Sequence, residues 1–319
     1  MSVQPASPAA DLPRLQAGGS PQHLLLTLLG DYWYGQRAPL PSAALVALLG
    51  EFGITEVSAR AALSRLARRG LLELSKAGRH TSYALSARAA EVLTEGRGHI
   101  LSFGAERPTW AGRWTVAAFS VPEDDRSRRH ALRTRLGWYG FAPLYDGLWV
   151  SPHERVAEVT AILAELGIDR ATVFTAELAD GGPDGGHPIR AWDLDALRAE
   201  YERILAGYEP VRRRWRNGKI GTAQALVART ELMDDWRTMP SLDPELPTEL
   251  LPDRWPRARA RELFVELYDG LAGLAEQRVV QVVSGYDADL AALVRSHTSH
   301  GHPSHGPSNH GRSNHGRDG

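Results

Sequence analysis

The chain has 319 residues, of which 43% are hydrophobic and 24% are charged, so it has apolar material for two or three globular domains. Its formal net charge is -1, and a site for a polyanion must therefore come from a local cluster of cations. It has no cysteine, which excludes disulfide scaffolds, thiolate metal sites and cysteine nucleophiles.

Neither a membrane span nor a secretory signal is expected. No run of roughly 18 or more apolar residues occurs, and the N-terminus lacks the basic start and apolar stretch of a signal peptide. We therefore expect a cytoplasmic protein without a membrane partner.

Both ends of the chain have a composition typical of disorder. Residues 1–20 are rich in Pro, Ala, Ser and Gly, and residues 291–319 are rich in His, Gly, Ser and Asn. The second segment holds six of the 12 histidines, and such tails can bind metal ions adventitiously. A solvated tail without a specific metal is the interpretation we prefer.

The pattern of residues 21–97 predicts three helices followed by a β-hairpin. Apolar residues at helical spacing begin the segment. Ser42 is a candidate N-cap for a second helix, and Thr55 is one for a third helix that ends before Gly70. Two short runs with alternating apolar residues then surround Gly78, which suits a hairpin turn. This order is typical of a winged helix-turn-helix domain.

The third predicted helix has two different faces, given about 3.6 residues per turn. One face is apolar and consists of Ala59, Ala62, Leu63 and Leu66. The opposite face carries Arg60, Ala61, Ser64, Arg65 and Arg68. The small side chains between the arginines allow the helix backbone to approach a surface closely while the guanidinium groups reach outward.

This helix and the hairpin form a basic segment. Residues 55–85 carry six arginines or lysines and two acidic residues, a local net charge of +4 on a nearly neutral chain. We predict that the helix enters the DNA major groove and that the hairpin contacts phosphates. The candidate DNA-binding residues are Ser58, Arg60, Ala61, Ser64, Arg65 and Arg68 on the helix and Lys76, Arg79 and His80 on the hairpin. A solvated helix face and a winged domain that binds protein are the alternatives.

Residues 98–180 predict a ferredoxin-like domain. The patterns run strand, helix, strand, strand, helix and strand, with Asp146-Gly147 as the hairpin signal between the two central strands. Three carboxylates follow the first strand: Glu123, Asp124 and Asp125. They are compatible with a metal-dependent nuclease, but Asp124 or Asp125 as a helix N-cap explains them equally well.

A Gly-rich linker at residues 180–188 precedes a mainly helical segment, residues 189–290. This segment contains the basic stretch VRRRWRNGK, which spans residues 211–219. Its arginines could meet a phosphate, a DNA backbone or an acidic surface, but a solvated face is the preferred interpretation.

Several stretches resemble the PaaX family of bacterial transcriptional repressors of phenylacetic acid degradation, over roughly residues 21–283. The stretches are GDY, ALLGEFGITEVSARAALSRLARRGLLE, GRHTSYALS and WRTMPSLDPELPTELLPDRWPRARARELFVELY. The resemblance implies an α+β chain with an N-terminal winged helix-turn-helix, a middle ferredoxin-like βαββαβ domain and a C-terminal mainly helical domain.

The resemblance also implies a repressor that an aryl-acetyl thioester of coenzyme A, such as phenylacetyl-CoA, releases from operator DNA. We expect a homodimer, because major-groove readers usually span two half-sites. An acyl-CoA site needs cations beside an aromatic cleft. The candidate ligand-binding residues are Arg212, Arg213, Arg214 and Trp215 with Trp138 and Tyr139.

No catalytic function is expected, and no cofactor. The chain lacks a GxSxG elbow, a Walker phosphate loop and a GxGxxG that opens a helix after a strand. Two other functions stay open: a metal-dependent nuclease built on the ferredoxin-like domain, and a DNA-binding scaffold without a small-molecule effector.

Overall fold

The structure, a computed structural model, describes residues 20–106, 109–122, 124–179 and 186–300. Most of the predicted N-terminal lead-in, most of the Gly-rich linker, Glu123 and residues 301–319 lie outside the described residues. The chain divides into two units. Unit 1 contains the residues up to Leu101, Tyr208–Trp236 and the residues from Leu263 onward, and unit 2 contains Ser102–Gly207 and Arg237–Glu262.

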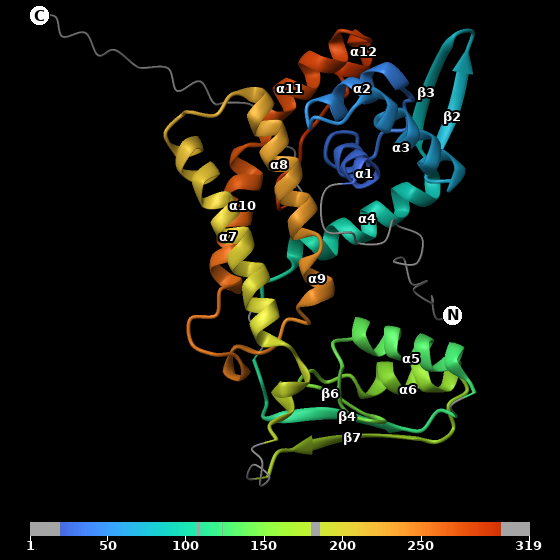
Figure 1. Cartoon of the computed structure of the whole chain (residues 1–319), viewed down its shortest axis with the longest axis vertical. Coiled ribbons are helices and arrows are strands. Elements are labelled where there is room, and N and C mark those ends of the chain that lie inside the picture. Colours follow the sequence, from blue (N-terminus) through green and yellow to red (C-terminus); the bar gives the residue numbers. More distant parts are fainter. Residues whose placement is uncertain (1–19, 107–108, 123, 180–185, 301–319) are drawn as a thin grey trace, which may run out of the picture. The chain divides into compact units, whose positions relative to one another are not determined.

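The first part of unit 1 is a winged helix-turn-helix, as predicted (Figure 1). Its elements are α1 (Pro21–Tyr32), β1 (Leu40–Pro41), α2 (Ser42–Gly50), α3 (Glu56–Arg68), β2 (Leu72–Ala77), β3 (His80–Leu85) and α4 (Ala87–Ser102). The three strands form an antiparallel sheet in the order β1-β3-β2. Ala77 pairs with His80, so Gly78 and Arg79 form a two-residue turn, in which Gly78 has φ +61.

Local chemistry sets the ends of these helices. Ser20 caps α1 by accepting a hydrogen bond from the backbone N–H of His23, and Pro21 occupies its first turn. Thr55 caps α3 by accepting the N–H of Ser58 at 3.3 Å. The buried residues of α3 are Ala59, Ala62, Leu63 and Leu66, the apolar face that the sequence predicts.

The helix α4 extends past the predicted boundary between the first two domains. The sequence pattern places the end of the first domain at residue 97, but the helix continues to Ser102. Leu101 is buried, and the carbonyl of Ile100 accepts a hydrogen bond from the indole of Trp236 at 3.2 Å. These packing contacts offset the poor helix propensity of Gly96 and Gly98.

The rest of unit 1 is helical. It contains α8 (Thr222–Trp236), α11 (Ala272–Ser284), α12 (Ala288–Ala291) and the parts of α7 (Leu194–Arg216) and α10 (Arg257–Gly270) that lie outside unit 2. Trp236 on α8 stacks on Phe264 of α10 with ring centroids 4.7 Å apart.

The prediction that a disordered tail begins at residue 291 is wrong for residues 291–300. Val294 and Ser296 are fully buried. The backbone N–H and hydroxyl of Ser296 donate to Glu276 at 2.6 and 2.8 Å. Ser299 donates in the same way to Asp269 at 2.6 and 2.7 Å. Composition predicts disorder here, but these serines meet carboxylates on α10 and α11.

Unit 2 contains the ferredoxin-like domain, as predicted. Its elements are β4 (Arg113–Phe119), α5 (Arg126–Trp138), β5 (Ala142–Tyr145), β6 (Leu148–Ser151), α6 (Val156–Glu165) and β7 (Ala171–Glu177). The strands form an antiparallel sheet in the order β5-β6-β4-β7. Figure 1 shows α5 and α6 on the same face of the sheet, where Leu132, Leu136 and Val159 share a core with Ala117.

The turn between β5 and β6 requires glycine. Gly147 has φ +73, and a Cβ at this position would lie 2.6 Å from the carbonyl oxygen of Phe119.

The face of the sheet opposite α5 and α6 has its own small core of Trp114, Val116 and Val150. Unit 2 is completed by η2 (Pro188–Ala191), α9 (Met239–Leu242), η3 (Thr248–Leu250) and its parts of α7 and α10.

Asp243, directly after α9, links α7 and α10 within unit 2. Arg257 donates to both of its carboxylate oxygens, at 2.7 and 2.9 Å, and Tyr201 donates its hydroxyl to the same carboxylate at 2.5 Å. The carboxylate is fully buried, so these partners supply the hydrogen bonds that its burial requires.

Candidate nucleic-acid interface

The outward face of α3 is largely exposed. Ser58, Ser64, Arg65 and Arg68 are exposed, and Ala61 is half-buried between them. Arg65 and Arg68 form no ion pair within the described part of the chain. Two guanidinium groups are therefore available to an anionic partner.

Arg60 differs from the other arginines because it already has a partner. Its guanidinium lies 2.7 Å from the carboxylate of Glu56, one turn earlier on α3. The side chains are 55% and 65% exposed, so solvent weakens the pair and the arginine can exchange Glu56 for another acceptor. Reaching a base would still require Arg60 to leave a carboxylate that it contacts in the free protein.

The wing, the hairpin of β2 and β3, extends the basic surface. Lys76, Arg79 and His80 are all exposed, with Arg79 in the turn and His80 directly after it. The hairpin and α3 belong to the same unit and lie side by side in Figure 1. The structure thus brings the predicted DNA-binding residues together on one domain, with helix side chains suited to bases and wing side chains suited to phosphates.

A buried arginine supports this domain from the C-terminal helices. Arg229 on α8 is fully buried and donates to Asp31 on α1 at 3.1 Å and to the hydroxyl of Tyr32 at 3.2 Å. It also donates to the carbonyls of Tyr268 and His297 at 2.9 and 2.6 Å. Four acceptors therefore surround the guanidinium, and its charge is compensated by Asp31.

Aromatic rings complete the surroundings of Arg229. Its guanidinium carbon lies 3.9 Å from the ring centroid of Tyr268, whose hydroxyl donates to Asp31 at 2.7 Å. Burial raises the pKa of Tyr32 to about 12, although Arg229 opposes that shift. Burial by itself would lower the pKa of Arg229, but Tyr268, Tyr32 and Asp31 raise it, so the arginine stays charged. Sequence reasoning missed this cluster, although Asp31 and Tyr32 belong to the quoted GDY stretch.

A second ion pair joins α11 to the end of α2. Arg278 donates to both carboxylate oxygens of Glu51 at 3.0 and 2.8 Å. Glu51 directly follows α2, the helix that precedes α3 in the helix-turn-helix. The C-terminal helices therefore hold the winged domain at two points.

The candidate ligand arginines mostly have structural partners. Arg212 pairs with Glu209 at 2.6 Å, and Arg214 donates to Gln224 at 2.8 Å. The ring of Trp215 packs on Gly270, where a Cβ would lie 2.2 Å from it. Arg213 is exposed and is the candidate best placed for a ligand phosphate.

The candidate ligand aromatics lie in unit 2, whereas these arginines lie in unit 1. Trp138 is 57% exposed at the end of α5. Tyr139 packs against the core between α5, α6 and the sheet. The prediction that the two sets form one ligand site stays untested.

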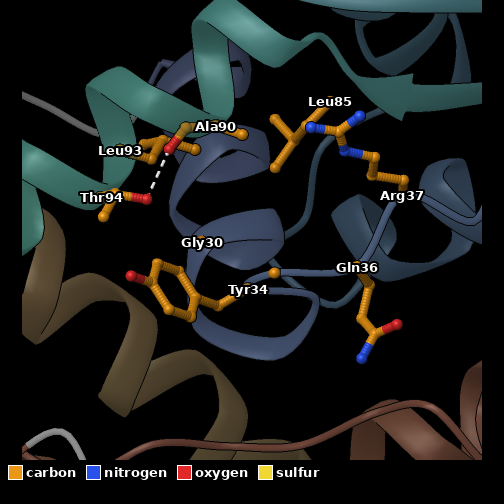
Figure 2. Close-up of a pocket in the computed structure, with 9 residues that line it drawn as sticks. Gly30, Tyr34, Gln36, Arg37, Leu85, Ala90, Leu93 and Thr94 are labelled. Carbon is orange, nitrogen blue, oxygen red and sulfur yellow. Dashed lines mark hydrogen bonds between the residues drawn. The ribbon is translucent and has the colours of Figure 1, made fainter.

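Unit 1 has a small pocket beside the wing (Figure 2). It lies between the end of α1, the end of β3 and α4, and Tyr34, Leu85 and Leu93 form its apolar part, with Arg37 at its edge. Its volume is about 170 Å³, below the roughly 300–1,000 Å³ of pockets that enclose drug-sized ligands. It is therefore too small to enclose a whole acyl-CoA molecule.

One of the carboxylates that follow β4 caps a helix. Asp125 accepts a hydrogen bond from the backbone N–H of Arg128 at 3.1 Å at the start of α5, which supports its interpretation as a helix N-cap. Among the described residues, no group of three or more His, Asp or Glu side chains is arranged to hold a metal ion.

In the same part of the chain, no helix has the length and apolar composition needed to cross a membrane.

Family models match three successive parts of the chain. They are described as PaaX-like protein at residues 20–89, PaaX protein central Cas2-like domain at residues 107–187 and PaaX-like protein C-terminal domain at residues 192–281. The chain is 28% identical over 258 residues to the transcriptional repressor PaaX of Escherichia coli (strain K12), which covers 79% of this chain and 80% of that protein.

A solved structure is also similar. It is that of the uncharacterized protein Rv0674 from Mycobacterium tuberculosis, with a TM-score of 0.52 and 22% identity over 82% of this chain and 98% of that one. This likeness concerns the fold alone.

Proposed function

Because the chain belongs to the PaaX family, we propose that it is a transcriptional repressor that binds operator DNA through α3 and the wing. The observation that carries this proposal is the exposed basic face of α3 beside a basic hairpin, on a chain whose net charge is only -1. A local cationic surface attracts the phosphate backbone, and the arginines of α3 can read guanine edges.

In this proposal, DNA binding, dimerisation and effector sensing are assigned to the three predicted domains. Residues 21–97 bind the operator, and residues 98–180 and 189–290 form a homodimer and sense the effector. A dimer places two copies of α3 on half-sites separated by about one helical turn of DNA or a multiple of it. The protein acts as a regulator in the cytoplasm rather than as an enzyme.

The effector in this proposal is an acyl-CoA such as phenylacetyl-CoA, which releases the protein from aromatic-catabolism operators. Release requires the ligand to bind the DNA-incompetent arrangement more tightly than the competent one. A tenfold loss of DNA affinity needs about 1.4 kcal/mol of coupling, and DNA must weaken the ligand by the same factor. Arg213 is the first candidate to bind the CoA phosphates, because its neighbours Arg212 and Arg214 already contact side chains of the protein itself.

The test is a titration of the full chain on the promoter upstream of its own gene and on scrambled DNA of equal length and composition. The proposal predicts tighter binding to the promoter and at least a tenfold loss of promoter affinity with saturating phenylacetyl-CoA. Free coenzyme A is the ligand control. Equal binding to both DNAs would contradict operator recognition, and an unchanged affinity with phenylacetyl-CoA would remove it as the effector. DNA cleavage in the presence of magnesium would favour the nuclease alternative.

A further inference from the structure

Val57 is the most exposed large hydrophobic side chain in the described part of the chain. It is 80% exposed, compared with 64% for Tyr145, the next most exposed. It occupies the first turn of α3, directly after Glu56. Single apolar residues on a surface are common, so its position must decide whether it has a role.

Folding gives no reason for a valine here. The residues that α3 buries are four others, and Val57 does not belong to that face. A β-branched side chain also loses rotamer freedom in a helix, so valine is a poorer helix former than alanine or leucine. Neither core packing nor helix propensity accounts for this residue.

The helix geometry places Val57 on the outward stripe of α3. Ala61, Ser64 and Arg65 follow it by four, seven and eight positions, and residues at these spacings share one helical face. Recognition helices of helix-turn-helix proteins contact base edges mainly with their N-terminal residues. Val57 therefore lies where the helix would reach deepest into the major groove.

An apolar side chain has one specific partner on base edges in the major groove, which is the C5-methyl group of thymine. We propose that Val57 packs against the methyl group of an operator thymine and selects thymine at that base pair. This inference rests on the proposed function, because it requires α3 to occupy the major groove. It assigns to Val57 a base contact that hydrogen-bonding residues of the same stripe cannot make.

The experiment uses the full chain and promoter DNA in which each thymine is replaced, one at a time, by deoxyuridine, which lacks only the methyl group. At one or more positions, the wild-type protein should lose affinity by about fourfold, the effect of no longer burying one methyl-sized group. Val57→Ala should lose a similar factor on unmodified DNA and become insensitive to deoxyuridine at that position. Val57→Thr keeps one methyl group at the same place and should retain part of the sensitivity.

Two controls separate the possible outcomes. Tyr286→Ala removes another exposed apolar side chain, 50% exposed and outside the winged domain, and should leave the deoxyuridine profile unchanged. Thermal unfolding should show Val57→Ala to be at least as stable as the wild type, because alanine favours the helix. If Val57→Ala keeps the wild-type profile, or loses affinity equally on promoter and scrambled DNA, the methyl contact is wrong while operator binding stands. If the wild type does not prefer the promoter at all, both the proposed function and this contact fail.

Discussion

Arg229 on α8 donates a hydrogen bond to Asp31 on α1 at 3.1 Å, and both side chains are buried. The two residues are 198 positions apart in the sequence. The first helix of the winged domain and the C-terminal helices therefore share one core inside unit 1. A change in those helices has a direct physical route to the winged domain.

Breaking this pair should destabilise the protein strongly. Arg229→Met leaves Asp31 buried without its cation and removes the hydrogen bonds that Arg229 donates to two backbone carbonyls. We expect a loss of about 3–5 kcal/mol in the free energy of unfolding, measured by urea denaturation. The control is Arg278→Met, which breaks the more exposed pair with Glu51 and should cost about 0–1 kcal/mol. Similar small losses for both variants would show that the buried pair is not important for stability.

The winged domain should not fold well alone. A fragment of residues 20–102 lacks α8 and α11, so Asp31 loses Arg229 and Glu51 loses Arg278. The apolar face that α1 presents to α8 would also become exposed. We expect the fragment to show no cooperative thermal transition by circular dichroism. A sharp transition with native-like helix content would mean that the C-terminal helices are dispensable for the fold.

The wing should contribute charge without sequence preference. Replacing Lys76 and Arg79 by alanine should lower affinity for promoter and scrambled DNA alike, because phosphate contacts carry no sequence information. The slope of log affinity against log salt should decrease by about 0.9 for each lost contact. Lys219→Ala, an exposed lysine outside the wing, is the control and should leave the slope unchanged. An unchanged slope in the double variant would place the hairpin away from DNA.

Glu56 should restrain Arg60 in the free protein. Glu56→Gln removes the carboxylate that holds Arg60 and one negative charge near the DNA phosphates. DNA affinity should rise, and the salt dependence should become steeper. Stability should fall by less than about 1 kcal/mol, because a negative charge in the first turn favours the helix. A fall in affinity would indicate instead that Glu56 accepts a hydrogen bond from a cytosine amino group.

Local patterns were sufficient to predict much of the fold. The spacing of Ala59, Ala62, Leu63 and Leu66 predicts both faces of α3, because helical periodicity is a local property. Gly78 and the Asp146-Gly147 pair mark their hairpins because positive φ angles favour glycine.

Contacts between distant segments could not be predicted in this way. Nothing near Arg229 indicates that its acceptor is Asp31, and nothing near Ser296 indicates that Glu276 will accept its hydrogen bonds. The same reason explains the length of α4, where packing of Leu101 outweighs two glycines. The exposed basic face proposed to bind DNA was thus predictable as a surface, whereas its support by the C-terminal helices was not.

The central claim is that the outward face of α3 reads operator sequence, and Arg65→Ala tests it most directly. Fluorescence anisotropy should compare the wild type, Arg65→Ala and the exposed-arginine control Arg213→Ala on promoter and scrambled DNA, without effector. An arginine that forks onto guanine contributes about 1–3 kcal/mol of discrimination, so Arg65→Ala should lose most of its preference for the promoter while retaining most of its affinity for scrambled DNA. Arg213→Ala should keep the preference. An Arg65→Ala variant that binds the promoter as tightly and as selectively as the wild type would contradict the account.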